Sequence, residues 1–81
     1  MSTRFVALAD TGEEVAATEA HDQAEETDAL RILTAKALHE AKLLGVELNL
    51  VAAWPDCAVR VGRVEGDKVT WVLGADGRVW A

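Results

Sequence analysis

The sequence contains a single cysteine, Cys57, a single proline, Pro55, and no tyrosine among its 81 residues. One cysteine cannot form an intramolecular disulfide, so the fold has to be stable without a covalent cross-link, which is typical of a reducing compartment. The apolar run near the N-terminus, residues 5–9, is short and acids follow it at once, so it lacks the pattern of a secretory signal. We therefore expect a cytoplasmic protein.

Long apolar runs are also missing. No segment approaches the roughly 18 apolar residues that a membrane-spanning helix needs. Even so, 51% of the residues are hydrophobic, which is enough for a packed core and argues against a disordered chain. A chain of this length supports one core, and we expect a single domain over residues 1–81 with no membrane insertion.

Basic residues are absent from the most acidic stretch of the chain. Residues 10–28, DTGEEVAATEAHDQAEETD, contain eight acids and no lysine or arginine, whereas the whole chain has 14 acids and 8 bases. The net charge of −6 argues against direct binding to nucleic acid or to anionic lipid, because both require basic surfaces. The same charge favours solubility, and it favours a basic partner if the protein has one.

A helix after this stretch is the clearest element. Asp22 is placed to cap it, Glu25 stands three residues later as in a capping box, and Gly45 is a suitable residue to end it. Apolar residues recur at helical spacing and form one stripe, made of Leu30, Leu33, Ala37, Ala41 and Leu44 with Leu38 at its edge. Ile32 and Leu43 lie on a second line, and we expect them to be exposed if only one face packs.

Turn residues divide the rest of the chain into short strands. Residues 5–9 and 14–18 flank Asp10-Thr11-Gly12 and predict a hairpin. After Gly45 the apolar residues alternate, and turns at 55–56, 65–67 and 74–77 separate four further strands, the last being residues 78–81. The sequence therefore predicts an α+β fold, with one long helix packed on a curled antiparallel sheet of about four to six strands in the order β(β)αββββ. Trp71 is expected in its core.

The sequence offers little that points to catalysis. Asp10-Thr11-Gly12 after an apolar strand resembles the active-site triplet of aspartic proteases, in which two copies of the aspartate share a proton. Here Glu13 follows, where that family has alanine or serine, so an ordinary turn is the favoured interpretation and a dimeric protease is an alternative. His21, His39 and Cys57 lack the spacing of metal ligands. We expect no enzyme activity, no metal and no cofactor.

The acidic stretch has two competing explanations. Acids in the first turn of a helix stabilise it by about 0.3–1 kcal/mol each, but Glu13, Glu14 and Glu19 precede the helix and repel one another. We therefore predict a surface for a basic partner, formed by Glu13, Glu14, Glu19, Asp22, Glu25 and Glu26. A solvated surface and local disorder stay open. Ile32, Leu43 and Trp80 form a second candidate contact, and the chain is expected to be a monomer or a weak homodimer.

A small, acidic α+β domain of this kind resembles the anti-CRISPR proteins of phages and mobile elements that act on type I interference complexes. Residues 64–80, VEGDKVTWVLGADGRVW, look like the terminal hairpin of some members. The resemblance implies a non-catalytic inhibitor that binds a basic backbone subunit in the bacterial host cell and excludes target DNA. A small antitoxin or accessory subunit that caps a basic enzyme is the alternative.

Overall fold

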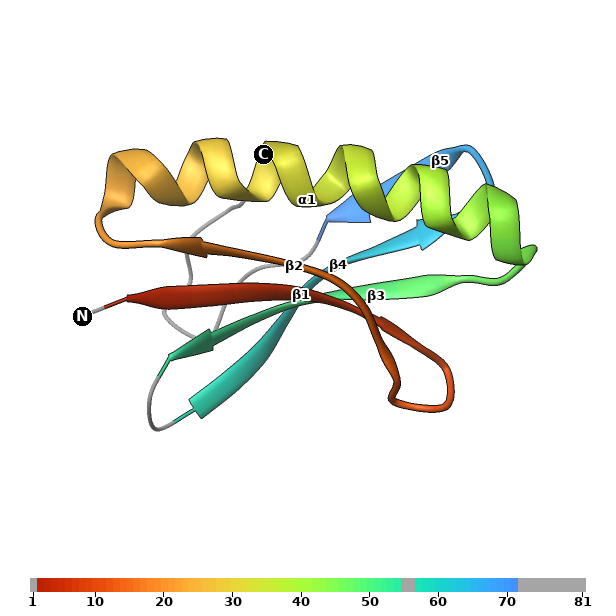
Figure 1. Cartoon of the computed structure of the whole chain (residues 1–81), viewed down its shortest axis with the longest axis horizontal. Coiled ribbons are helices and arrows are strands. Elements are labelled where there is room, and N and C mark those ends of the chain that lie inside the picture. The colour runs from red at the N-terminus through yellow and green to blue at the C-terminus, as the bar shows by residue number, and fades with distance from the viewer. Residues whose placement is uncertain (1, 55–56, 72–81) are drawn as a thin grey trace.

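The computed structural model describes residues 2–54 and 57–71. Its elements are β1 (Thr3–Ala9), β2 (Glu14–Ala20), α1 (Gln23–Leu44), β3 (Leu48–Trp54), β4 (Cys57–Glu65) and β5 (Lys68–Trp71). The strands form one antiparallel sheet in the order β2-β1-β3-β4-β5, and α1 lies across one face of it (Figure 1). The predicted α+β fold is confirmed. The predicted last strand, residues 78–81, lies outside the described residues.

The N-terminal hairpin forms where the sequence predicts it, with longer strands. The amide of Gly12 donates to the carbonyl of Ala9 at 2.8 Å, and the amide of Ala9 donates to the carbonyl of Glu13 at 2.9 Å. Gly12 has a φ of 88°, a conformation that costs glycine little. Asp10-Thr11-Gly12 therefore forms the turn of the predicted hairpin. β1 pairs with β2 on one side and with β3 on the other, which makes it a central strand.

Both ends of α1 are closed by the residues that the sequence nominates. The side chain of Asp22 accepts a hydrogen bond from the amide of Glu25 at 2.8 Å, and the side chain of Glu25 accepts one from the amide of His21 at 3.3 Å. Gly45 adopts the left-handed conformation, with a φ of 67°, and its amide donates to the carbonyl of Ala41. These contacts satisfy backbone groups that the helix ends would otherwise leave unpaired.

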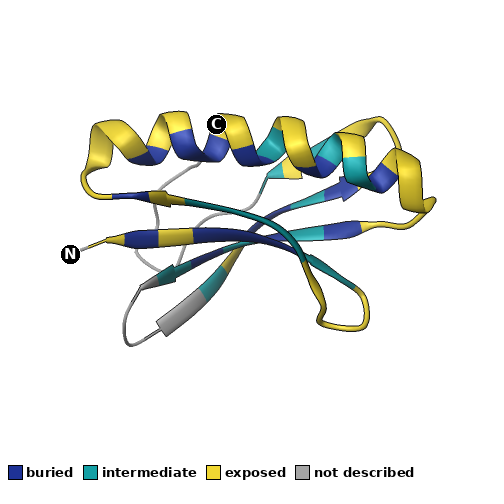
Figure 2. Ribbon diagram, viewed as in Figure 1, coloured by how far each residue is buried: buried dark blue, intermediate teal, exposed yellow. Residues whose placement is uncertain are grey.

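The buried face of α1 is shifted towards its N-terminus relative to the predicted stripe. Leu30, Leu33, Ala37 and Ala41 are buried as predicted, and Ala29 and Glu26 join them (Figure 2). Leu44 was assigned to the stripe wrongly and is 52% exposed, because the helix ends at this residue and Gly45 redirects the chain. The alternating apolar residues after Gly45 were expected to begin a strand at Val46, but β3 begins at Leu48 and Val46 is exposed.

The core lies between α1 and the sheet face beneath it. Alternate residues of the strands supply the sheet side, and the small residues among them, together with the alanines of α1, allow close packing. The buried sheet residues of this cluster are Phe5, Ala7, Ala20, Leu48, Leu50, Ala52, Val61 and Val64. Val69 and Trp71 are half-buried against the cluster, which agrees with the core position predicted for Trp71.

A β-bulge between Leu50 and Val51 sets the register of β4. Leu50 pairs with Gly62 and Val51 pairs with Arg60, so Val61 of β4 is the extra residue of the bulge, and its side chain is buried. Gly62 lies opposite Trp71, and a side chain at Gly62 would meet the carbonyl oxygen of Thr70 at 2.9 Å. A glycine is needed here because the carbonyl of Thr70, the indole ring of Trp71 and the side chain of Leu50 leave no room for a Cβ atom.

Candidate functional site

The carboxylates predicted to bind a partner lie along one edge of the molecule, on β2 and at the start of α1. Within the described sheet, β2 pairs with β1 alone, so its other side is an edge. The exposed carboxylates of this region, here called the acidic edge, belong to Glu13, Glu14, Glu19, Asp22 and Glu25. Seven strand residues span roughly 20 Å, so Glu13 and Glu14 form one group and Glu19, Asp22 and Glu25 another at the opposite end of β2.

Three members of the acidic edge also have roles within the chain. Asp22 and Glu25 close the start of α1, and Glu14 forms an ion pair with Arg4 of β1. This ion pair is half exposed at both side chains, so its contribution to stability is small. In the described part of the chain, the side chains of Glu13 and Glu19 have neither a hydrogen-bonding nor an ion-pair partner. Helix capping thus accounts for part of the acidic stretch and leaves Glu13 and Glu19 unexplained.

Glu26 was predicted to be part of the same surface, and the structure places it elsewhere. Its exposed fraction is 9%, and it accepts a hydrogen bond from the hydroxyl of Thr3 at 3.1 Å. It therefore links α1 to β1 from inside the fold and is not a member of the acidic edge. Its position, three and four residues before the buried Ala29 and Leu30, is the sequence signal that would have revealed it.

A second charged group, which the sequence alone did not reveal, surrounds Arg63 of β4. Its guanidinium forms ion pairs with Glu47, just before β3, and with Glu65 on the same strand. The hydrogen bond with Glu47 raises the pKa of Arg63 above its ordinary value, and the nearby charges of Glu47, Asp10 and Glu65 act in the same direction. Arg63 is therefore positively charged at neutral pH.

The candidate secondary contact is not brought together by the fold. Ile32 is 51% exposed and Leu43 is 68% exposed, as predicted for residues off the buried stripe. They lie eleven residues apart on α1, which corresponds to roughly 16 Å along the helix axis. Trp80, the third residue of this prediction, lies outside the described residues. Ile32 and Leu43 are separate exposed side chains, which are ordinary on a protein surface.

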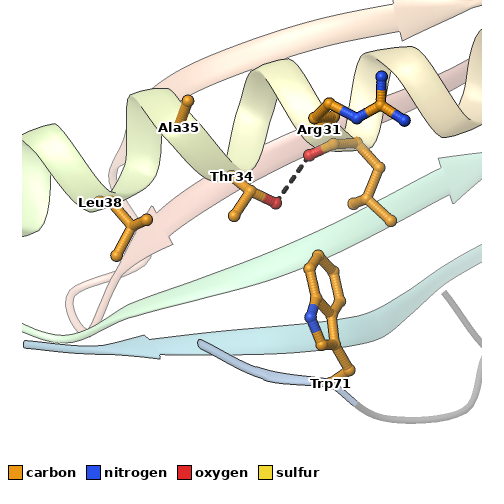
Figure 3. Close-up of a pocket in the computed structure, with 6 residues that line it drawn as sticks. Arg31, Thr34, Ala35, Leu38 and Trp71 are labelled. Carbon is orange, nitrogen blue, oxygen red and sulfur yellow. Dashed lines mark hydrogen bonds between the residues drawn. The ribbon is translucent and has the colours of Figure 1, made fainter. Parts of the chain in front are cut away.

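A hollow of about 300 Å³ lies between α1 and β5 (Figure 3). The side chains that line it are mainly apolar, namely Leu30, Arg31, Thr34, Ala35, Leu38 and Trp71. The hydroxyl of Thr34 is held by the carbonyl of Leu30 at 2.7 Å, and Arg31 forms an ion pair with Asp28. The indole of Trp71 points from β5 towards the helix and forms one wall (Figure 3).

In residues 2–54 and 57–71, no group of three or more histidine, cysteine, aspartate or glutamate side chains is placed to hold a metal ion. The side chain of Cys57 lies outside the part of the chain that the structure describes. In the described residues, α1 lacks the long apolar stretch that a membrane-spanning helix requires.

In comparisons with known proteins, no protein-family model, curated protein or solved structure matches this chain.

Proposed function

We propose that this protein is a non-catalytic inhibitor that binds a basic surface of a nucleic-acid-handling complex through its acidic edge. The observation that carries the proposal is the placement of charge along this edge. Five exposed carboxylates follow β2 and the start of α1, and Arg4 is the only lysine or arginine in residues 1–30. A negative surface of this length attracts a positive one and repels nucleic acid.

The way the carboxylates are held favours binding. Asp22 and Glu25 are fixed by the capping contacts at the start of α1, and Glu14 and Glu19 stand on a strand of the sheet. Groups held by regular structure lose less conformational freedom on binding than groups on a loose tail. Lysine and arginine side chains of a partner would then form charge-assisted hydrogen bonds with these carboxylates.

The partner proposed is the backbone subunit of a type I CRISPR interference complex. This choice comes from the resemblance to anti-CRISPR proteins, and the acidic edge supplies the chemistry that it requires. A surface that holds nucleic acid is lined with lysine and arginine, because phosphate contacts dominate its affinity. A protein that occupies those side chains excludes target DNA without any reaction.

Capture from a bacterial lysate that contains type I interference complexes tests this function. The tagged protein should retain the complex, as identified by mass spectrometry, and the purified complex should lose binding to its target DNA in a gel-shift assay when the protein is added first. Failure to retain the complex, or retention with undiminished DNA binding, would contradict the proposal. Capture of a single basic enzyme that loses its activity would favour the alternative function, a small antitoxin or accessory subunit.

A further inference from the structure

The sheet face that α1 leaves uncovered, here called the open face, has an apolar centre. Phe5 and Leu50 point towards α1 and are fully buried, so the residues that alternate with them point the other way. The register aligns Ala17, Val6, Val51 and Arg60 in one row across β2, β1, β3 and β4. The apolar members of the open face are Val6, Leu8, Ala17, Val51 and Ala53, of which Val6 is buried and the others half-buried.

Charged residues on the open face are divided between its two sides. Arg4 is paired with Glu14, and Arg63 is paired with Glu47 and Glu65. In the described residues, three exposed charges of the open face have no ion-pair partner: Glu19 on β2, Arg60 on β4 and Lys68 on β5. The β2 side of the open face therefore keeps a negative charge, and the β4–β5 side keeps positive charges.

This division makes the open face complementary to a copy of itself. A two-fold axis that lies between two open faces and runs parallel to the strands places β2 of one copy over the β4–β5 side of the other. An axis that runs across the strands places β2 over β2 and β4 over β4, so the negative sides of the two copies meet and the positive sides meet. Only the first arrangement brings unlike charges together, and it also places Val6 near Val51 of the second copy.

We propose that a second copy of this chain packs on the open face about a two-fold axis parallel to the strands. Glu19 of each copy then lies over β4 of the other, two residues along the strand from the level of Arg60 and within reach of its long side chain. Aligned packing of two sheets, about 10 Å apart, is a common arrangement. The contact area is limited by the four or five strands of a small sheet, so the dimer is weak and forms at high protein concentration. The proposal goes beyond the proposed function and does not depend on it.

Sedimentation equilibrium at low salt, from micromolar to millimolar protein, tests this dimer. The average molecular mass should rise with protein concentration from the monomer value of 8.7 kDa towards twice that value. Arg60→Glu and Glu19→Arg should each weaken association about tenfold or more, because each places like charges opposite one another at both ends of the interface. Both side chains are exposed, and circular dichroism checks that each variant stays folded.

A mixture of the two variants provides the decisive comparison. When Arg60→Glu protein meets Glu19→Arg protein, each of the two contacts again joins unlike charges, so the mixed dimer should regain about the affinity of the parent. The double variant Glu19→Arg/Arg60→Glu should regain it as well. A parent that stays monomeric at millimolar concentration, single variants that dimerise like the parent, or a mixture that remains monomeric would each overturn the proposal. Arg60→Glu leaves the acidic edge unchanged, so partner capture by this variant reports on the proposed function separately.

Discussion

Replacing Leu33 with alanine should lower the free energy of unfolding by about 2–5 kcal/mol, the usual range for a fully buried leucine. Leu33 is 0% exposed at the middle of the buried face of α1, so the truncation removes apolar contacts and leaves a cavity beneath the helix. A domain of this size has a total stability of roughly 4–12 kcal/mol. The variant should therefore be marginally folded at room temperature.

Leu43→Ala is the matched control for this prediction. It makes the same chemical change ten residues later on α1, at a side chain that is 68% exposed. Its free energy of unfolding should stay within about 0.5 kcal/mol of the parent's. Urea denaturation followed by circular dichroism measures both values. Equal losses of stability in the two variants would show that the buried face of α1 has been assigned wrongly.

The second large effect concerns binding to the captured partner. An edge variant, Glu13→Gln/Glu14→Gln/Asp22→Asn/Glu25→Gln, should bind about tenfold to several hundredfold more weakly, from about 0.3–1 kcal/mol lost per charge pair. Asparagine caps a helix as well as aspartate, and glutamine can replace glutamate in a capping box, so α1 keeps its start. Glu19, a member of the acidic edge that also lies on the open face, is left in place so that its contact in the proposed dimer is kept.

A control variant separates this effect from net charge alone. Glu40→Gln/Glu47→Gln/Glu65→Gln/Asp67→Asn also removes four negative charges, so both variants change the net charge from −6 to −2. The control should bind the partner with less than about a tenfold loss of affinity, since none of its four charges belongs to the acidic edge. Raising the salt from about 0.1 M to about 1 M shortens the electrostatic screening length from about 10 Å to about 3 Å. This change should weaken binding of the partner by the parent protein and have less effect on binding by the edge variant. Equal losses of affinity in both four-charge variants would contradict a localised site.

The features that the sequence predicted correctly are local ones. The ends of α1 depend on hydrogen bonds between residues three or four apart, so Asp22, Glu25 and Gly45 indicated them directly. The turns at Gly12 and Gly66 are local features as well. The backbone has a positive φ at both positions, which glycine adopts most easily, so the glycines themselves indicated the turns. The alternating residues after Gly45 indicated strands without reference to the rest of the fold.

Features that depend on the path of the whole chain could not be predicted in this way. Leu44 continues the helical stripe, but it becomes exposed because the chain turns at Gly45 towards β3. Glu26 was classified by its charge, and its burial follows from the position of Thr3, which is 23 residues away in the sequence. The bulge at Val61 fixes the pairing of Arg60 only once β3 and β4 are aligned.

The candidate site shows the same limit. The sequence identified the acidic residues, but their grouping at the two ends of β2 depends on the strand order, in which β2 is an edge and β1 is central. The pairing of Glu14 with Arg4 follows from the hairpin register. The residual charges of the open face could be found only after the strands were placed side by side.

Hydrogen exchange of the protein, measured by mass spectrometry with and without the captured partner, tests the central claim most directly. If the acidic edge binds the partner, backbone amides of residues 13–25 should exchange more slowly in the complex, because β2 is an edge strand and its outward amides become covered. The exchange rates of the backbone amides of residues 57–65 in β4 should change little. Protection confined to β4, or to the outer surface of α1 around Ile32 and Leu43, with unchanged exchange along residues 13–25, would contradict the account.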